Sequence, residues 1–141
     1  MNEIKFRAKT VMDGEWCYGY LVYSDETLPK IVRIDRGICR IDDVDDNTIG
    51  QYTGLKDKQG NEIYEGDILR PFDFTHIDKL VVWNSEEARF SVENINWSDY
   101  GYMQLSQSYI NEFDFWVVGN MHDNPELIKN KNEDKEQDVR K

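Results

Sequence analysis

The sequence has few of the cysteines that cross-link small secreted domains, and it lacks the long apolar runs that anchor a chain in a membrane. Its 141 residues include two cysteines and three prolines, and no apolar run approaches the ~18 residues of a transmembrane helix. Cys17 and Cys39 lie far apart, outside any Cys/His metal-binding spacing, so we expect reduced thiols. The opening MNEIKFRAKTVMDGEW lacks the apolar block of a signal peptide. Together these absences predict a soluble cytoplasmic protein.

Basic residues are also scarce. Lysine and arginine number 17 against 28 acidic residues, which gives a formal net charge of −11. Such a surface repels nucleic-acid phosphates and anionic lipid at long range. The charge fits either simple solubility or attraction to a basic partner protein, and the sequence leaves both open.

Short alternating segments separated by turn residues predict a mainly β fold. Ile4, Phe6 and Ala8 alternate with basic residues in a strand over Glu3–Thr10, and Asp13-Gly14 turns the chain into a second strand. That strand, Glu15–Tyr23, places a set of apolar residues on one face: Trp16, Tyr18, Tyr20 and Val22. A second hairpin pairs Ile31–Ile34 with Ile38–Ile41 across Gly37.

The acidic connector Asp42–Thr48 is expected to be a solvated loop. Further along, Lys79–Trp83 and Ala88–Ile95 predict another hairpin, with a bulge after Glu93-Asn94. The remaining elements are a helical turn within Leu105–Phe113, a last strand over Phe115–Val118, and a short helix capped by Asp123 or Asn124 with Pro125 at its first position.

These segments predict one domain over residues 1–128, built from several antiparallel hairpins that form coiled sheets or an SH3-like barrel, with a short C-terminal helix. The charged tail over residues 129–141 has too few apolar residues to offset its chain entropy, and we expect it to be disordered.

The central stretch TGLKDKQGNEIYEGDIL, Thr53 to Leu69, concentrates glycines and carboxylates. It is not a phosphate loop, because five residues separate Gly54 from Gly60 and Asn-Glu stands where Lys-Ser/Thr is required. Instead, Asp57–Asn61 predicts a hairpin loop with Gly60 in the left-handed conformation. We expect the Asp67 carboxylate to accept hydrogen bonds from backbone amides around the Glu65-Gly66 turn.

No catalytic, metal or cofactor site emerges from the sequence. Asp43, Asp45 and Asn47 match the first ligands of an EF-hand loop, but the glycine and glutamate that should follow are missing. His76 and His122 stand outside any nucleophile or metal motif. The aromatic residues of the strands are interpreted as core, and WSDYGY supplies the candidate exposed interaction surface: Trp97, Tyr100 and Tyr102.

The segment IGQYTGLKDKQGNEIYEGDIL resembles the signature of the YopX-like proteins of bacteriophages and prophages, and IKFRA and VVGNMHDNPELI agree with it. The resemblance spans residues 3–128, although Lys9-Thr10-Val11 departs from it. It implies a β-rich fold of coiled sheets and carries over no enzymatic activity. The matching residues, whose role we interpret as structural, are Tyr52, Gly54, Leu55, Asp57, Gly60, Ile63, Tyr64, Gly66 and Asp67.

The leading hypothesis is a non-enzymatic phage accessory protein in the bacterial cytoplasm, acting through contacts with a second copy of itself or with a host or phage protein. One alternative is a nucleic-acid- or nucleotide-binding barrel, which needs a local basic patch such as Lys5, Arg7 and Lys9, or Lys56 and Lys58. Another is a metal-dependent enzyme that uses a carboxylate cluster.

Overall fold

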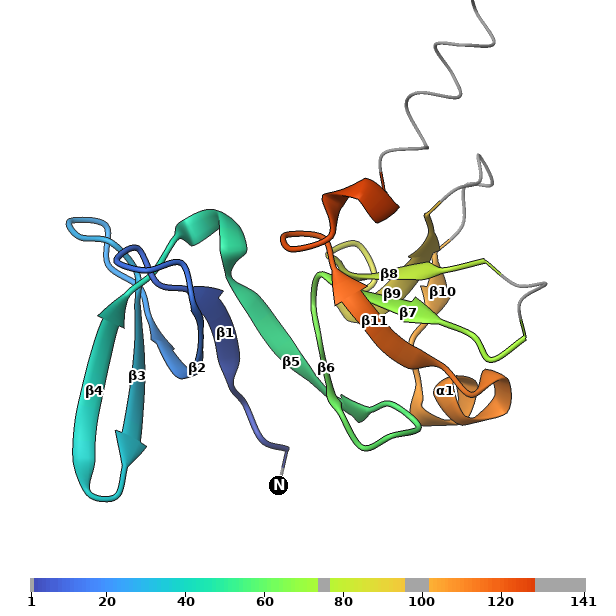
Figure 1. The fold of residues 1–141 in the computed structure, drawn as a ribbon, viewed down its shortest axis with the longest axis horizontal. Coiled ribbons are helices and arrows are strands. Elements are labelled where there is room, and N and C mark those ends of the chain that lie inside the picture. The colour runs from blue at the N-terminus through green and yellow to red at the C-terminus, as the bar shows by residue number, and fades with distance from the viewer. Residues whose placement is uncertain (1, 74–76, 96–101, 129–141) are drawn as a thin grey trace, which may run out of the picture. The chain divides into compact units, whose positions relative to one another are not determined.

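A computed structural model describes residues 2–73, 77–95 and 102–128 (Figure 1). Within these ranges the fold is mainly β, with eleven strands in two antiparallel sheets and one short α-helix. The predicted fold class is confirmed, and since neither sheet closes into a barrel over the described residues, the coiled-sheet form is the one observed. The chain divides into two compact units, Met1–Gly54 and Leu55–Lys141. The single domain over residues 1–128 stays a prediction, and the tail lies outside the described residues.

The first sheet has the strand order β4-β3-β2-β1-β5-β6. Its strands are β1 (Phe6–Lys9), β2 (Trp16–Val22), β3 (Lys30–Asp35), β4 (Ile38–Asp43), β5 (Gly50–Lys56) and β6 (Glu62–Tyr64), with the 3₁₀ turn η1 (Asp46–Thr48) between β4 and β5. The second sheet has the order β10-β9-β8-β7-β11. Its strands are β7 (Asp67–Arg70), β8 (Lys79–Asn84), β9 (Arg89–Asn94), β10 (Met103–Gln104) and β11 (Trp116–Asn120). The helix α1 (Gln107–Phe113) and the 3₁₀ turn η2 (Pro125–Leu127) complete the second unit.

The core of the first unit lies on the face of β2 opposite to its aromatic residues. Its fully buried members are Ala8, Cys17, Ile31 and Val44. The interpretation of the strand aromatics as core is therefore wrong for Tyr18 and Tyr20, which are 43% and 66% exposed. Ile4 is exposed as well, because β1 begins only at Phe6.

The predicted hairpin of β3 and β4 is confirmed. Arg36 and Gly37 both adopt positive φ, 50° and 80°, as a two-residue hairpin turn requires. The register runs from Asp35 opposite Ile38 to Lys30 opposite Asp43. β2 pairs with β3 only over Lys30–Val32, so the half of the hairpin nearest the turn extends beyond β2.

The acidic connector is more ordered than a solvated loop. Val44 is fully buried in the core of the first unit and pairs with Thr10. Thr48 is buried too, and its hydroxyl accepts a hydrogen bond from the Lys9 amide at 2.9 Å. The aspartates made this connector resemble a loop in the sequence. Their side chains face solvent, but the backbone continues the sheet.

The second unit has two apolar clusters. One contains Ile63, Leu69, Val81, Val92, Leu105, Ile110 and Phe115, and the other contains Ile68, Leu80 and Ile95. The hairpin of β8 and β9 is confirmed, but its register is unbroken from Lys79–Asn94 to Asn84–Arg89, so the expected bulge is wrong. The irregularity lies instead in β11, between Val117 and Gly119, opposite β7.

The helical turn expected before β11 is α1, which buries Ile110 and is capped by Ser106 through the Tyr109 amide at 3.1 Å. The expected C-terminal helix is a single 3₁₀ turn with Pro125 at its start. Asn124 does not cap it, because its side-chain oxygen accepts from the Asn120 amide instead. None of the helices in the described ranges has the length and apolar character needed to cross a bilayer.

Candidate functional site

The Asp57 carboxylate organises the hairpin loop of the central stretch. Oδ1 accepts hydrogen bonds from the Gln59 amide at 2.9 Å and the Asn61 amide at 2.8 Å. Oδ2 accepts from the Asn61 side chain at 3.2 Å and from the Val117 amide of β11 at 3.0 Å. Burial raises the pKa of this carboxyl, but the backbone amides of Val117 and Asn61 outweigh burial and the pKa is lowered.

This loop also covers an edge of the second sheet. β11 is the outermost strand of that sheet. The Val117 amide is taken by Asp57, and the Phe115 carbonyl next to it accepts the Lys58 amide at 3.2 Å. An exposed strand edge is a template for unwanted pairing, and the loop blocks it here.

Asp67 behaves as expected from the sequence. Its side chain is 1% exposed, and Oδ2 accepts a hydrogen bond from the Tyr64 amide at 2.7 Å. The adjoining Gly66 donates its amide to the Val81 carbonyl and accepts from the Met121 amide, both at 2.9 Å. The turn is thereby tied to β8 and to the loop after β11.

The other signature residues are mostly packed in the interior. Ile63 and Tyr64 are buried in the second unit, Tyr52 is buried in the first, and Leu55 packs against the larger apolar cluster. Gly60 has φ of +86° and donates its amide to the Asp57 carbonyl at 3.0 Å, which is the left-handed conformation predicted for it. Gly54 and Gly66 also have positive φ. These contacts lie within the fold, and the structural role of the signature residues stays a prediction.

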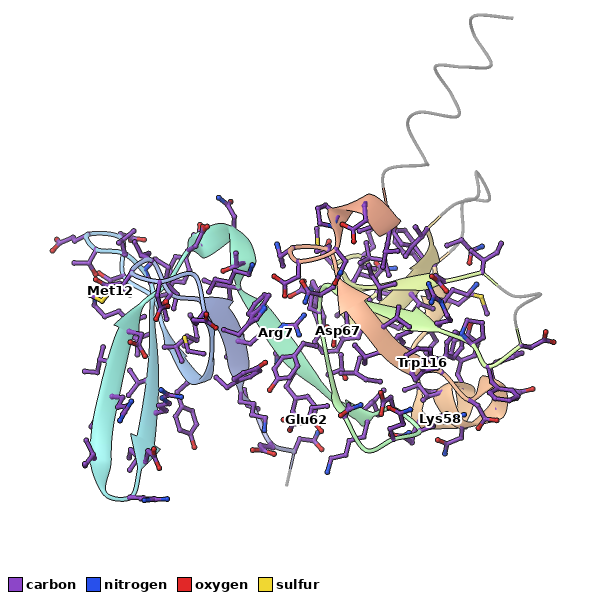
Figure 2. All side chains as sticks on the ribbon, in the orientation of Figure 1. Arg7, Met12, Lys58, Glu62, Asp67 and Trp116 are labelled. Atoms are coloured by element: carbon purple, nitrogen blue, oxygen red, sulfur yellow. The ribbon has the colours of Figure 1, made fainter. Side chains whose placement is uncertain are left out.

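A hollow of about 260 Å³ lies beside the signature loop, where Figure 2 shows Lys58 and Trp116 close together. It is lined by Lys58, Gln59, Arg70, Pro71, Phe72 and Trp116. Its two cations are engaged: the Lys58 ammonium lies 4.5 Å from the Phe72 ring centroid, and Arg70 makes a bidentate ion pair with Asp78, 2.8 Å at its shorter bond. The hollow is smaller than most ligand pockets.

The basic patches and the exposed aromatic surface can now be located. Arg7 and Lys9 both lie over the Trp16 ring, at 4.6 and 5.4 Å from its centroid, and Lys5 lies over Tyr52. Tyr102 is 57% exposed. Trp97, Tyr100 and His76 lie outside the described residues. In the part of the chain that the structure describes, no group of three or more His, Cys, Asp or Glu side chains is placed to hold a metal ion.

An open backbone edge belongs to β4, the outermost strand of the first sheet (Figure 1). The Val44 amide donates to Pro29 on the β3 side, whereas the Asp43 carbonyl accepts from the Val11 amide on the outer side. Because backbone groups alternate in direction along a strand, the amide and carbonyl groups of Cys39 and Ile41 also face outward. Over the described residues no strand pairs with them. Within the described ranges, Val11 covers one end of this edge.

The side chains around this edge are apolar and basic. Ile34, Ile38 and Ile41 are 73%, 62% and 60% exposed. Arg33 and Arg40 stand directly opposite each other on one face of the hairpin. In the described chain neither guanidinium forms an ion pair, and the buried Arg33 Nε has no hydrogen-bond partner. Like charges placed directly opposite in a sheet are destabilising.

Sequence reasoning missed this site, although a signal for it was present. The Arg36-Gly37 turn fixes the register of a two-residue hairpin, and that register alone puts Arg33 opposite Arg40. The length of β2 was the missing information, since β2 pairs with β3 only over Lys30–Val32 and leaves the β3 edge nearest the turn without a partner strand in the described residues.

Comparison with known proteins is consistent with this fold. Residues 5–129 match the family model described as YopX protein. The chain is similar to a solved structure, protein EF1440 from Enterococcus faecalis, with 28% identity and a TM-score of 0.59 over 92% of this chain and 100% of that one. No curated protein matches the sequence. The family match covers most of the chain, which therefore belongs to the YopX family.

Proposed function

We propose that this YopX-family chain is an accessory protein of a bacteriophage or prophage that works in the cytoplasm of the bacterial host. It acts by binding another protein and not by catalysis. The observation that carries the proposal is the outer edge of β4, where Cys39 and Ile41 offer backbone hydrogen-bonding groups between exposed isoleucines.

The edges of β11 and β4 differ in how far they are covered, and this contrast supports a binding role. The signature loop satisfies the Val117 amide and Phe115 carbonyl at the edge of β11. At β4 the Val11 amide covers the Asp43 carbonyl, and over the described residues no strand pairs with Cys39 or Ile41. Exposed apolar edges favour aggregation unless they are protected, so an edge left open beside three isoleucines is better suited to a partner strand than to solvent.

The exposed Cys39 thiol gives a direct test. Cys17 is buried, so a thiol-reactive photo-crosslinker added to the folded protein attaches at Cys39. We expect irradiation in host extract to produce a specific protein adduct. The matched control carries Cys39→Ser with Lys58→Cys, which moves the crosslinker to an exposed position of the second unit.

An adduct from Cys39 that the control lacks, and that Ile41→Pro removes, supports the proposal. Proline at this position deletes an amide that faces away from β3, so the hairpin itself keeps its hydrogen bonds. Equal adducts from both positions, or none from Cys39, would contradict a binding role for this edge.

A further inference from the structure

We infer that the β4 edge takes an extended segment of a partner protein in which one carboxylate residue stands between two apolar residues. This inference rests on the proposed function and names the chemistry of the partner.

The backbone fixes where such a segment can lie. The edge is closed at Asp43 by Val11, and the hairpin turns at Arg36 and Gly37. A partner strand therefore lies beside residues 38–42 and bonds to the outward groups of Cys39 and Ile41. Main-chain bonds of this kind supply affinity in strand addition, and alternate side chains supply specificity.

The side chains on the two faces of β4 select different partner residues. Cys39 and Ile41 point to one face, where partner residues opposite them meet sulfur and aliphatic carbon and are best apolar. Arg40 points to the other face, and the partner residue opposite it belongs to a pair without backbone hydrogen bonds, in which side chains are closest. A carboxylate fits this position because guanidinium binds it in a bidentate manner.

The charge balance around Arg40 favours an acidic partner residue. Arg33 is directly opposite it, with Asp35 and Asp42 diagonal to the pair on the same face. Neither aspartate forms an ion pair with either arginine over the described residues. From Lys30 to Asp43 the hairpin carries four basic residues (Lys30, Arg33, Arg36, Arg40) and three acidic residues (Asp35, Asp42, Asp43), 4 − 3 = +1, in a chain of net charge −11. A carboxylate beside Arg40 relieves the like-charge pair.

A synthetic peptide of sequence Thr-Val-Glu-Val-Thr with blocked ends serves as the probe. It is titrated into the full-length ¹⁵N-labelled protein, and amide shifts are followed by NMR at peptide concentrations up to several millimolar. We expect the Cys39 and Ile41 amides, which face the peptide, to shift more than the Arg40 amide, which faces β3. A peptide with N-methylated valines should lose this pattern.

A charge exchange tests the role of Arg40. Arg40→Glu should weaken binding of the glutamate peptide by about tenfold and should prefer the same peptide with lysine in place of glutamate. Lys58→Glu changes the net charge equally and should leave binding unchanged. Arg40 is exposed, and the gain of lysine-peptide binding shows that the variant is folded.

The inference is overturned if wild type binds the lysine peptide as well as the glutamate peptide, if shifts map away from β4, or if no shift occurs. If an oligothymidylate binds as tightly as the glutamate peptide, the edge recognises phosphate and the inference is overturned. If the protein forms a dimer that Ile41→Pro dissociates, the occupant is a second copy of the chain and the inference is also overturned. If the peptide fails while the Cys39 crosslinker still captures a protein, the proposed function survives. If the crosslinker captures none, the proposed function fails whatever the peptide does.

Discussion

Removing the Asp57 carboxylate should lower the free energy of unfolding of the second unit by about 3 kcal/mol. The carboxylate is on a residue 5% exposed, and it accepts the backbone amides of Gln59, Asn61 and Val117. A buried donor left without an acceptor costs about 1–3 kcal/mol. Because Gln59 and Asn61 are in an exposed loop that water can enter, the lower end of that range, about 1 kcal/mol, applies to each of them, and a similar cost at Val117 gives about 3 kcal/mol for Asp57→Ala.

The Asp57→Asn variant distinguishes the hydrogen bonds within the loop from the hydrogen bond that covers the edge of β11. The amide side chain keeps one oxygen, which can still accept the Gln59 and Asn61 amides. Its NH₂ group then meets the Val117 amide, so two donors face each other. We expect this variant to cost about half as much as alanine, and the Val117 amide to exchange with solvent faster in both.

The same carboxylate predicts a dependence on pH. Hydrogen bonds hold the folded-state pKa of Asp57 below its ordinary value, which is about 3.9 for an unfolded chain. A lowered pKa contributes stability that is fully present above the unfolded pKa and is lost as pH falls through the folded pKa. The difference between wild type and Asp57→Asn should thus be constant from neutral pH to about pH 5 and shrink in more acidic solution.

Urea unfolding followed by tryptophan fluorescence measures these differences, and hydrogen exchange at Val117 assigns them to the edge of β11. Glu112→Ala is the control, since Glu112 is an exposed carboxylate in α1 of the same unit. A cost below about 1 kcal/mol for Asp57→Ala, or Val117 exchange unchanged in Asp57→Asn, would refute the assignment of the loop as an edge cap.

Three further outcomes are expected. Gly19→Ala should destabilise the first unit by about 2 kcal/mol or more in urea unfolding, because its Cβ would approach the Val32 carbonyl oxygen to 2.4 Å; a neutral result would contradict the close approach of β2 and β3. Cys39 should react with a thiol reagent in the folded protein, whereas Cys17 should react only after unfolding, since Cys17 is buried and burial raises its pKa. Equal reaction rates of the two thiols in the folded protein would contradict this expectation. Asp67→Ala should lower the unfolding midpoint by several degrees in calorimetry, because a buried backbone amide loses its acceptor, and an unchanged midpoint would count against that role.

The turns of this fold are predictable from sequence because they depend on local chemistry. Gly37 and Gly60 stand where positive φ is needed, and Asp57 precedes a loop whose amides it accepts. Such features involve residues within four positions of one another, so no tertiary information is required. The hydrogen bond between Asp57 and Val117 could not be predicted from the sequence, because it joins residues far apart in the chain and depends on the tertiary fold.

The buried faces are harder to predict, because alternation defines two faces without saying which one is covered. In β2 the apolar aromatic face looks like the core. The register instead places Lys9 opposite Trp16 and Ala8 opposite Cys17. Small residues on the second face allow the segment containing Val44 to pack there, while the Trp16 ring contacts the Arg7 and Lys9 side chains of β1.

The family-signature residues and the candidate site lie in different parts of the fold for a physical reason. The signature residues Asp57 and Asp67 accept hydrogen bonds from backbone amides of the second unit, so we interpret their role as structural. Neither arginine of the Arg33–Arg40 pair forms an ion pair inside the described chain. The pair lies on a hairpin that extends past its neighbouring strand. Folding alone would favour a neutral or opposite-charge pair there. Under the proposed function, a carboxylate of the bound partner offsets the cost of keeping two arginines face to face at β4.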